Sequence, residues 1–426
     1  MLEKREMVSA RKKNCNTLQA ASCNGYEAIV KLLLENGAEV NAKGGKYGNA
    51  LQAASYKGYG TIVKLLMENG AEVNAKGGLY GNALQAALLT GSNKEIMKLL
   101  LEKGAEVNAK GGKYGYALQV ASFRGNKVVV KLLLENGAEV NAKGGEYGNA
   151  LQAASFGGNK VIVQLLLENG ADVNAKGGKY GNALQAASCK GYVAIVKLLL
   201  KNGVEVNTKE VKYGNELQAE SCRGYKAVMT LVLDNEADIN AVGGIFVNAL
   251  QAASFKGTEA IVKLLLENGV EVNATGGTYG NALQAAVVSY QDNAMIVKLL
   301  LVNGAEVNAK GGEYGNALQA ASFQGKEVIV KILLENGAEV NAEGGRFGNA
   351  LQAASFKGTE TIVKLLLENG SEVNAQGGEY GNALQAASFQ GKEVIVKLLL
   401  ENGAEVNAEG GRFGNALQCY DFEQLK

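Results

Sequence analysis

The dipeptide Leu-Gln recurs along the whole chain at an almost constant spacing. Ten of the twelve intervals between successive copies are 33 residues long, and the other two are 34 and 35. Self-similarity at a period of this size is typical of stacked repeats, in which each copy is one small supersecondary unit. We therefore expect twelve full repeats and a truncated thirteenth, stacked in one dimension instead of folded into separate globular domains. The leucines are Leu18, Leu51, Leu84, Leu118, Leu151, Leu184, Leu217, Leu250, Leu283, Leu318, Leu351, Leu384 and Leu417.

The second repeat illustrates the local structure that each copy encodes. Asn49 is a favourable N-cap, because its side-chain oxygen can accept from an amide at the start of a helix. An Ala-rich helix is predicted over residues 50–57, and Gly58 ends it. A second helix is predicted over residues 60–68. Gly70 lies just after it and can adopt the left-handed conformation that often follows a helix. The remaining residues of the repeat are too few for another helix and contain a Gly-Gly pair that suits a tight turn.

Helices of eight or nine residues are marginal in water, so their stability must come from neighbouring copies. The small alanines of the QAAS segment allow adjacent repeats to pack closely. The two longer intervals contain ALLTGSNKEI and AVVSYQDNAM where other repeats have segments such as ASFKGTEAI, so the extra residues fall between the two helices of a repeat. The sequence therefore predicts an all-α solenoid of about twelve helix-turn-helix units with projecting β-turn loops.

The repeat resembles the ankyrin repeat. The segment NALQAAS at Asn149–Ser155 matches the family's T-P-L-H-x-A-A pattern, and IVKLLLENGVEVNA at Ile261–Ala274 matches its second half. The sequence replaces Thr, Pro and His of the family pattern by Asn, Ala and Gln, and Gln can still bridge backbone groups. The combination of NALQAAS with GGxYG is similar to arrays of filamentous-fungal ankyrin proteins.

The resemblance covers residues 14–420, which leaves a polar N-terminal lead-in at 1–13 and a C-terminal tail at 421–426. A weak point is predicted near 210–240, either as a drifting copy or as a functional hinge. There Glu220 replaces a small buried alanine, which is costly for an unpaired charge. Glu236 replaces the glycine that ends the second helix, which adds the backbone cost of a left-handed non-glycine residue. The alternative is that Asn235 shifts into that left-handed role.

Composition excludes several kinds of chemistry. The chain has no His, so it can form neither a Ser-His or Cys-His catalytic pair nor a His-based zinc site. Its five cysteines form no CxxC motif, and no Gly-Lys-Ser/Thr follows any GGKYG segment, whose glycines are interpreted as turn residues. We expect no enzyme activity, no cofactor and no metal. Because no segment has the apolar length of a signal peptide or membrane helix, localisation is predicted to be cytoplasmic or nuclear.

Two loop positions in each repeat carry most of the charge that differs between copies. Up to residue 212 they hold ten lysines and one glutamate, whereas the later copies mix Lys310, Arg346 and Arg412 with four glutamates. In ankyrin arrays the partner usually lies against the loop tips and inner helices, so the resemblance makes this basic row a candidate binding surface. Its residues are Lys43, Lys46, Lys76, Lys110, Lys113, Lys143, Glu146, Lys176, Lys179, Lys209 and Lys212.

A third position, late in the first helix, is aromatic in many repeats, and a basic residue such as Arg124 often follows it. One interpretation is packing between neighbouring first helices. The other is a row of anchors for a partner, because aromatic and Arg side chains are typical hot spots of interfaces. Both can hold at once. The aromatic residues are Tyr56, Phe123, Phe156, Phe255, Phe323, Phe356 and Phe389.

These patterns predict a monomeric, non-enzymatic scaffold that binds a protein along its concave face and loop tips. An acidic or phosphorylated segment is the expected partner. The formal net charge of +1 disfavours nucleic acid, and no membrane contact is expected. Two alternatives remain: a nuclear coregulator of a fungal gene cluster, to which Arg11, Lys12 and Lys13 add a weak targeting signal, and the sensor array of an immune-like receptor.

Overall fold

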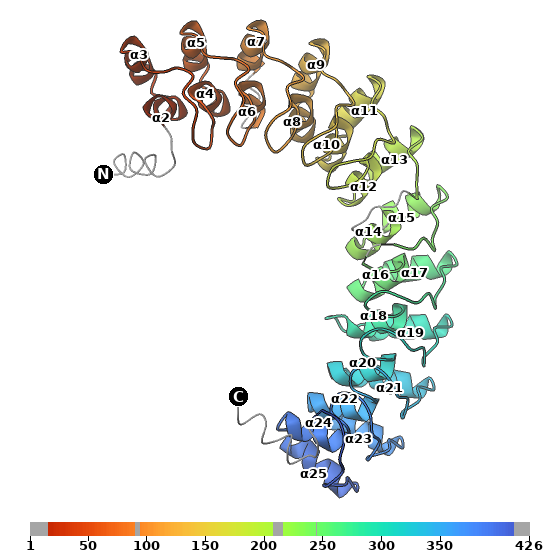
Figure 1. Ribbon diagram of the computed structural model, residues 1–426. Coiled ribbons are helices and arrows are strands. Elements are labelled where there is room, and N and C mark those ends of the chain that lie inside the picture. The colour runs from red at the N-terminus through yellow and green to blue at the C-terminus, as the bar shows by residue number, and fades with distance from the viewer. Residues whose placement is uncertain (1–15, 90–93, 208–215, 244, 413–426) are drawn as a thin grey trace. The chain divides into compact units, whose positions relative to one another are not determined.

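A computed structural model describes residues 16–89, 94–207, 216–243 and 245–412 (Figure 1). The chain divides into two compact units, Met1–Glu205 and Val206–Lys426, here called the N-terminal and C-terminal units. The predicted lead-in at 1–13 and tail at 421–426 lie outside the described residues, as do Lys209 and Lys212.

The N-terminal unit contains six helix pairs, as the 33-residue period predicts. Loops and first helices lie on one side of the unit, and second helices lie on the other (Figure 1). Its pairs are α2 (Thr17–Asn24) with α3 (Glu27–Glu35), α4 (Ala50–Lys57) with α5 (Gly60–Glu68), α6 (Ala83–Leu89) with α7 (Lys94–Glu102), α8 (Ala117–Arg124) with α9 (Lys127–Glu135), α10 (Ala150–Phe156) with α11 (Lys160–Glu168), and α12 (Ala183–Ser188) with α13 (Val193–Lys201).

The described part of the C-terminal unit contains six further pairs with the same arrangement. The insertion of the 35-residue interval lies between two helices of one pair, as predicted, whereas that of the 34-residue interval falls partly outside the described residues. The pairs are α14 (Glu216–Arg223) with α15 (Lys226–Leu233), α16 (Ala249–Lys256) with α17 (Glu259–Glu267), α18 (Ala282–Val288) with α19 (Ala294–Val302), α20 (Ala317–Gln324) with α21 (Glu327–Glu335), α22 (Ala350–Lys357) with α23 (Glu360–Glu368), and α24 (Ala383–Phe389) with α25 (Glu393–Glu401).

Local capping signals set the ends of the helices. The side chain of Asn49 accepts a hydrogen bond from the backbone N–H of Gln52 at 2.8 Å, which satisfies one amide at the start of α4. Gly58 follows α4 with φ of 83°, and Gly70 follows α5 with the same φ. These are the cap residues that the sequence predicts, and both helices have the predicted bounds.

The core of each unit lies between first and second helices and between neighbouring first helices. Ala53 and Ala54 of α4 are fully buried, and α4 packs against both α2 and α6. Small side chains at these two positions let the first helices approach one another closely, as the QAAS pattern predicts. From α5, Ile62, Val63 and Leu66 complete the buried layer. Aliphatic burial of this kind is the main favourable contribution to folding.

In both units, a buried glutamine of the first helix ties one repeat to the next. The side-chain amide of Gln52 donates to the carbonyls of Ala75 at 3.0 Å and Gly81 at 2.8 Å, both of which belong to the following loop. Gln152 and Gln352 make the same pair of bonds in their own repeats. The predicted bridging role of this glutamine is therefore confirmed, and the bridge links adjacent copies.

The loops are short glycine turns. An antiparallel bridge joins Gly77 to Gly81, and equivalent bridges recur in both units. Gly78 has φ of 62°, and a Cβ atom built on it would lie 2.5 Å from the carbonyl carbon of Tyr47 in the preceding loop. The Gly-Gly pair is thus required both by backbone conformation and by close contact between successive loops.

The expectation of a left-handed non-glycine residue in the irregular repeat is confirmed, and the alternative of a shift to Asn235 is wrong. Glu236 itself has φ of 63°, whereas Asn235 does not take the left-handed conformation. The amide of Glu236 donates to the carbonyl of Leu233 at 3.1 Å, and the amide of Ala237 donates to Val232 at 3.2 Å. These bonds fix which position must be left-handed, so the role cannot move back by one residue. The side chain of Glu220 lies outside what the structure describes.

Candidate functional site

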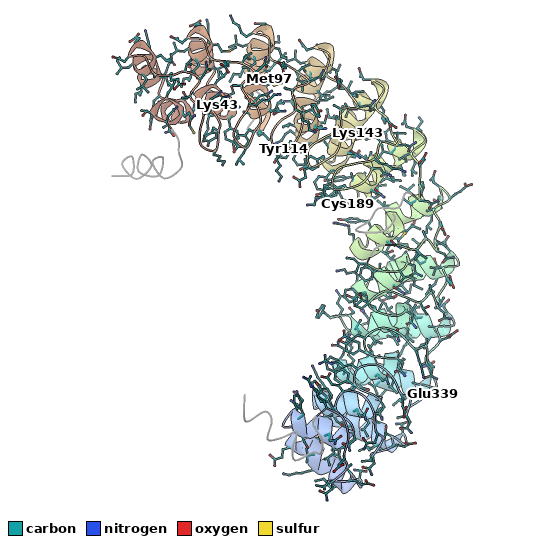
Figure 2. The ribbon with its side chains drawn as sticks, viewed as in Figure 1. Lys43, Met97, Tyr114, Lys143, Cys189 and Glu339 are labelled. Carbon is teal, nitrogen blue, oxygen red and sulfur yellow. The ribbon has the colours of Figure 1, made fainter. Side chains whose placement is uncertain are left out.

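The loops and first helices of each unit form one continuous surface, called the loop-side surface from here on. Hydrogen bonds between loop tips hold it in register: the amide of Leu79 donates to the carbonyl of Lys46 at 2.9 Å, and that of Lys179 donates to Glu146 at 2.8 Å. In Figure 2, Tyr114 lies at the edge that the loops of the N-terminal unit form, whereas Met97 lies among the second helices. Equivalent positions of successive repeats therefore line up along this edge.

The structure places the described lysines of the predicted basic row on the loop-side surface of the N-terminal unit, and all are exposed. One lysine per loop forms no ion pair within the described part of the chain. These lysines are called the unpaired lysine row, and they are Lys43, Lys76, Lys110, Lys143 and Lys176. Lys46 instead lies 5.9 Å from the ring centroids of Tyr47 and Tyr80.

Glu146 interrupts the positive charge of this unit. Its carboxylate lies 2.9 Å from the ammonium nitrogen of Lys113 and 3.7 Å from that of Lys179. The hydrogen bond and the charge of Glu146 raise the pKa of Lys113 above its usual value. The described lysines of the predicted basic row are thus of three kinds: two share a carboxylate, five form the unpaired lysine row, and Lys46 lies over aromatic rings.

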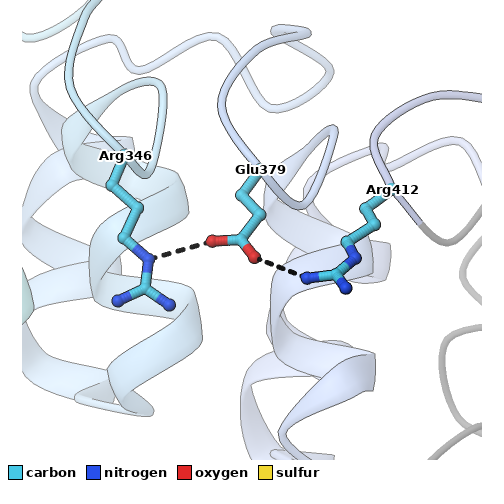
Figure 3. A network of polar contacts seen from close by, with 3 residues as sticks. All are labelled: Arg346, Glu379 and Arg412. Atoms are coloured by element: carbon cyan, nitrogen blue, oxygen red, sulfur yellow. Dashed lines mark hydrogen bonds and ion pairs between the residues drawn. The ribbon is translucent and has the colours of Figure 1, made fainter.

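One glutamate of the C-terminal unit bridges two arginines (Figure 3), as Glu146 bridges two lysines in the N-terminal unit. Glu379 lies between two arginines, 2.9 Å from Arg346 and 3.3 Å from Arg412. The hydrogen bond from Arg346 is the main cause that lowers the pKa of the Glu379 carboxyl, and Arg412 contributes less. The charges at the two loop positions of this unit nearly cancel, because these positions hold Lys310, Arg346 and Arg412 together with Glu313, Glu343, Glu379 and Glu409.

The predicted aromatic positions are half-buried, and their rings pack against a second set of rings on the loops. Tyr56 stacks on Tyr80 of the next loop at 4.4 Å between centroids, and Phe156 stacks on Tyr180 at 4.1 Å. Contacts between neighbouring first helices are longer, at 6.2 Å for Phe123 with Phe156. Packing between first helices is therefore only part of the arrangement, and the loop rings supply the closer contacts.

Rings from the first helices alternate with rings from the loops. This arrangement is called the aromatic ladder from here on. The loop rings were not singled out from the sequence, although an aromatic residue precedes the same loop glycine in most repeats. Arg124 follows one ladder residue and is exposed, and the ammonium of Lys190 lies 4.5 Å from the centroid of Phe156. The ladder consists of Tyr47, Tyr56, Tyr80, Tyr114, Phe123, Tyr147, Phe156 and Tyr180 in the N-terminal unit, and of Phe246, Phe255, Tyr279, Tyr314, Phe323, Phe347, Phe356, Tyr380 and Phe389 in the C-terminal unit.

Burial in the ladder changes the acidity of its tyrosines. Desolvation raises the pKa of Tyr147 to about 12. It also raises the pKa of Tyr180 and Tyr314. These phenols therefore stay neutral at physiological pH, so the ladder offers ring faces and O–H groups but no negative charge.

The arrangement can bind by charge, stacking and hydrogen bonds. No group of three potential metal ligands occurs among the residues that the structure describes. Within the same residues, no helix has the length and apolar character needed to cross a membrane.

Comparison with known proteins identifies the repeat. A family model for ankyrin repeats (three copies) matches residues 2–77, 51–144, 118–210, 217–311, 250–343, 283–377 and 317–410. The crystal structure of the human ASB11 ankyrin repeat domain is 28% identical and has a TM-score of 0.47; the match covers 52% of this chain and 98% of that domain. The search of curated proteins gave no match.

Proposed function

The chain belongs to the ankyrin repeat family, and on that premise we propose that it is a non-enzymatic scaffold that binds another protein on its loop-side surface. Ankyrin repeats generally mediate protein–protein interactions, and proteins built from them are generally not enzymes. The lack of His in the sequence and of a metal-ligand cluster in the described residues agrees with this role.

The partner we propose is an acidic or phosphorylated protein segment that follows the N-terminal unit. The observation that carries this proposal is the unpaired lysine row, Lys43, Lys76, Lys110, Lys143 and Lys176. Each of the five repeats concerned presents one exposed ammonium group in the same loop position, with no ion pair among the described residues. A row of like charges attracts an extended chain of opposite charge and speeds its association.

The aromatic ladder of the same unit supplies the second part of the proposed interface. Its rings are half-buried, so part of each ring remains available for contact. Aromatic side chains on a rigid support are frequent anchors in protein interfaces. Net charge argues against nucleic acid as the partner, because 43 basic and 42 acidic residues nearly cancel over the whole chain.

Fluorescence anisotropy with two labelled peptides tests the proposal: an alternating Glu-Ser repeat and its phosphoserine counterpart. The test variant changes all five lysines of the unpaired lysine row to Glu. The matched control changes five exposed lysines of second helices to Glu, which gives the same net charge at different places. Those control residues are Lys31, Lys64, Lys98, Lys131 and Lys197.

We expect the test variant to bind the peptides at least about tenfold more weakly than the control variant. We also expect the affinity of the unmodified chain to fall as salt is added, because exposed charges are screened. An equal loss of peptide affinity in both variants would show that only the total charge matters. Affinity that changes neither with salt nor in either variant would refute the proposal.

We further propose that the chain acts as a monomer in the cytoplasm or the nucleus. Light scattering after size-exclusion chromatography reports the mass in solution, and imaging of a tagged chain reports the compartment. A dimer mass or a secreted product would contradict this part.

A further inference from the structure

The aromatic ladder has a gap in the C-terminal unit. The last residue of α18 is Val288, at the position where the flanking first helices α16 and α20 carry Phe255 and Phe323. Ring contacts run as far as Tyr279, which lies 4.5 Å from Phe255, and they resume at Tyr314, which lies 5.3 Å from Phe323. No ring contact joins these two segments of the ladder among the described residues.

A cavity of about 150 Å³ occupies this gap. Its lining includes the aromatic residues Phe255, Tyr279 and Tyr314, the small aliphatic residues Val288 and Ala320, and polar residues such as Gln284 and Asn316. A cavity of this volume is large enough for a benzene ring. The space therefore corresponds in size and place to the aromatic side chain that other repeats supply from their own first helix.

The insertion in this repeat keeps the gap from being closed by the chain itself. The ammonium of Lys326 donates to the carbonyls of Ser289 and Gln291, and the side-chain amide of Asn293 donates to Ser254 at 3.0 Å. These bonds fix the connection between α18 and α19. Tyr290, which also lines the cavity, is 99% exposed and is therefore free to pack against a bound group at the rim.

In the N-terminal unit the ladder is also interrupted at the equivalent place, because no ring contact joins Tyr80 to Tyr114 within the described residues. There the chain has Leu89 at the ladder position, and this leucine is only 7% exposed. Leu is longer than Val, so it occupies more of the space that a ring would fill. The cavity thus follows from the small side chain at Val288 combined with a fixed connection.

The walls and rim of the cavity indicate what it would bind. Ring faces and aliphatic groups favour a planar apolar group, because offset or edge-to-face contacts between rings are favourable. The rim carries polar groups from Thr278, Glu313 and Gln324. Glu313 forms no ion pair within the described residues, so its carboxylate can accept from an O–H or N–H donor.

We propose that this gap is a subsite for one aromatic side chain, a tyrosine or tryptophan, of a protein partner that lies on the loop-side surface of the C-terminal unit. The ring of that side chain completes the aromatic ladder, and its O–H or N–H reaches the rim. The proposal rests on the proposed function, because it assumes that a protein segment lies on the loop-side surface. It adds the requirement that the partner carries an aromatic residue, which negative charge alone does not impose.

The absence of Trp from the chain gives a direct assay. N-acetyl-tryptophanamide is added as the probe, and its fluorescence is excited where tyrosine does not absorb, so that only the probe is observed. Val288→Phe fills the cavity from within. Val302→Phe is the matched control, because Val302 lies in α19 of the same repeat and is 85% exposed.

We expect probe anisotropy to rise with the unmodified chain and with Val302→Phe, and we expect affinity to fall about tenfold in Val288→Phe. N-acetyl-tyrosinamide should compete, whereas N-acetyl-leucinamide should not. If Val288→Phe does not fold, Tyr314→Leu removes one wall and should weaken binding in the same direction.

Equal binding by folded Val288→Phe and by Val302→Phe would overturn the proposal. So would competition by N-acetyl-trimethyllysinamide but not by the tyrosine derivative, because the subsite would then prefer a cation. The acidic peptides separate this result from the proposed function. If they still bind the N-terminal unit while the tryptophan probe does not bind, the subsite alone is wrong.

Discussion

The loop edges of the two units differ in charge although their repeats are built alike. In the N-terminal unit, five loops each present a lysine of the unpaired lysine row. In the C-terminal unit, the same loop position carries residues of mixed charge, among them Lys310, Glu343, Gln376 and Glu409. Below these tips the same buried glutamine links each first helix to the next loop in both units. These hydrogen bonds between successive repeats lie beneath the loop tips. Side chains at the tips can therefore vary without changing the fold.

The largest expected effect tests whether both units depend on that buried glutamine equally. Gln152→Leu and Gln352→Leu each remove the donor to two buried carbonyls, so each should lower the free energy of unfolding by about 2–4 kcal/mol. Urea unfolding measures the loss. Gln164→Leu, on the exposed side of α11, is the control and should change little. A large loss in one unit with none in the other would break the likeness between them.

The next effect concerns the aromatic ladder, which is continuous around Phe356 and interrupted at Val288. Phe356 lies 4.7 Å from Tyr380 and 5.2 Å from Phe347. Phe356→Ala should therefore cost about 1–3 kcal/mol, since the ring is only half-buried. Val288→Phe should instead raise the melting temperature by adding ring contacts. The two thermal shifts must have opposite signs, and a fall in both would mean that the gap cannot accept a ring.

The smallest effect concerns the ion pairs of the C-terminal unit. Arg346 lowers the pKa of Glu379, so the carboxylate's contribution to stability is present above the ordinary Glu pKa and is lost as pH falls through the lowered value. Because the pair is partly exposed, we expect only about 0.2–1 kcal/mol. Glu379→Gln should remove that part of the acid dependence, as followed by thermal unfolding across acidic pH. Glu335→Gln, an exposed change without an ion pair in the described residues, should leave the pH profile unchanged.

The sequence was sufficient for features that depend on near neighbours in the chain. Asn49, Gly58 and Gly70 were predicted as helix caps because a cap acts within three or four residues of itself. The period then gave the number of helix pairs and placed the predicted lysines on one side. Glu236 shows the limit even of local prediction, because the hydrogen bonds around it determine which residue must be left-handed.

Features that depend on the neighbouring repeat could not be predicted in the same way. The stacking of Tyr56 on Tyr80 requires the distance and twist between successive repeats, which spacing along the chain does not give. The same holds for Glu146, whose two lysine partners are each 33 residues away in sequence. The cavity at Val288 could not be predicted either, because it also requires that the connection between α18 and α19 is held where it does not cover the cavity. The fungal character of the array and the alternative nuclear and receptor roles stay predictions.

The central claim is that loop-tip charge determines binding while the buried bonds determine the fold, and transplanting the unpaired lysine row tests it most directly. The starting chain is the variant in which the five lysines of the unpaired lysine row are changed to Glu. Three further substitutions to Lys are then made, at Glu343, Gln376 and Glu409. Together with Lys310, they give the C-terminal unit a lysine row of its own. The measurement is the affinity for the phosphoserine peptide, with the melting temperature as a check on the fold. We predict that binding returns and that the melting temperature stays the same. Binding that stays lost in a correctly folded variant would contradict it.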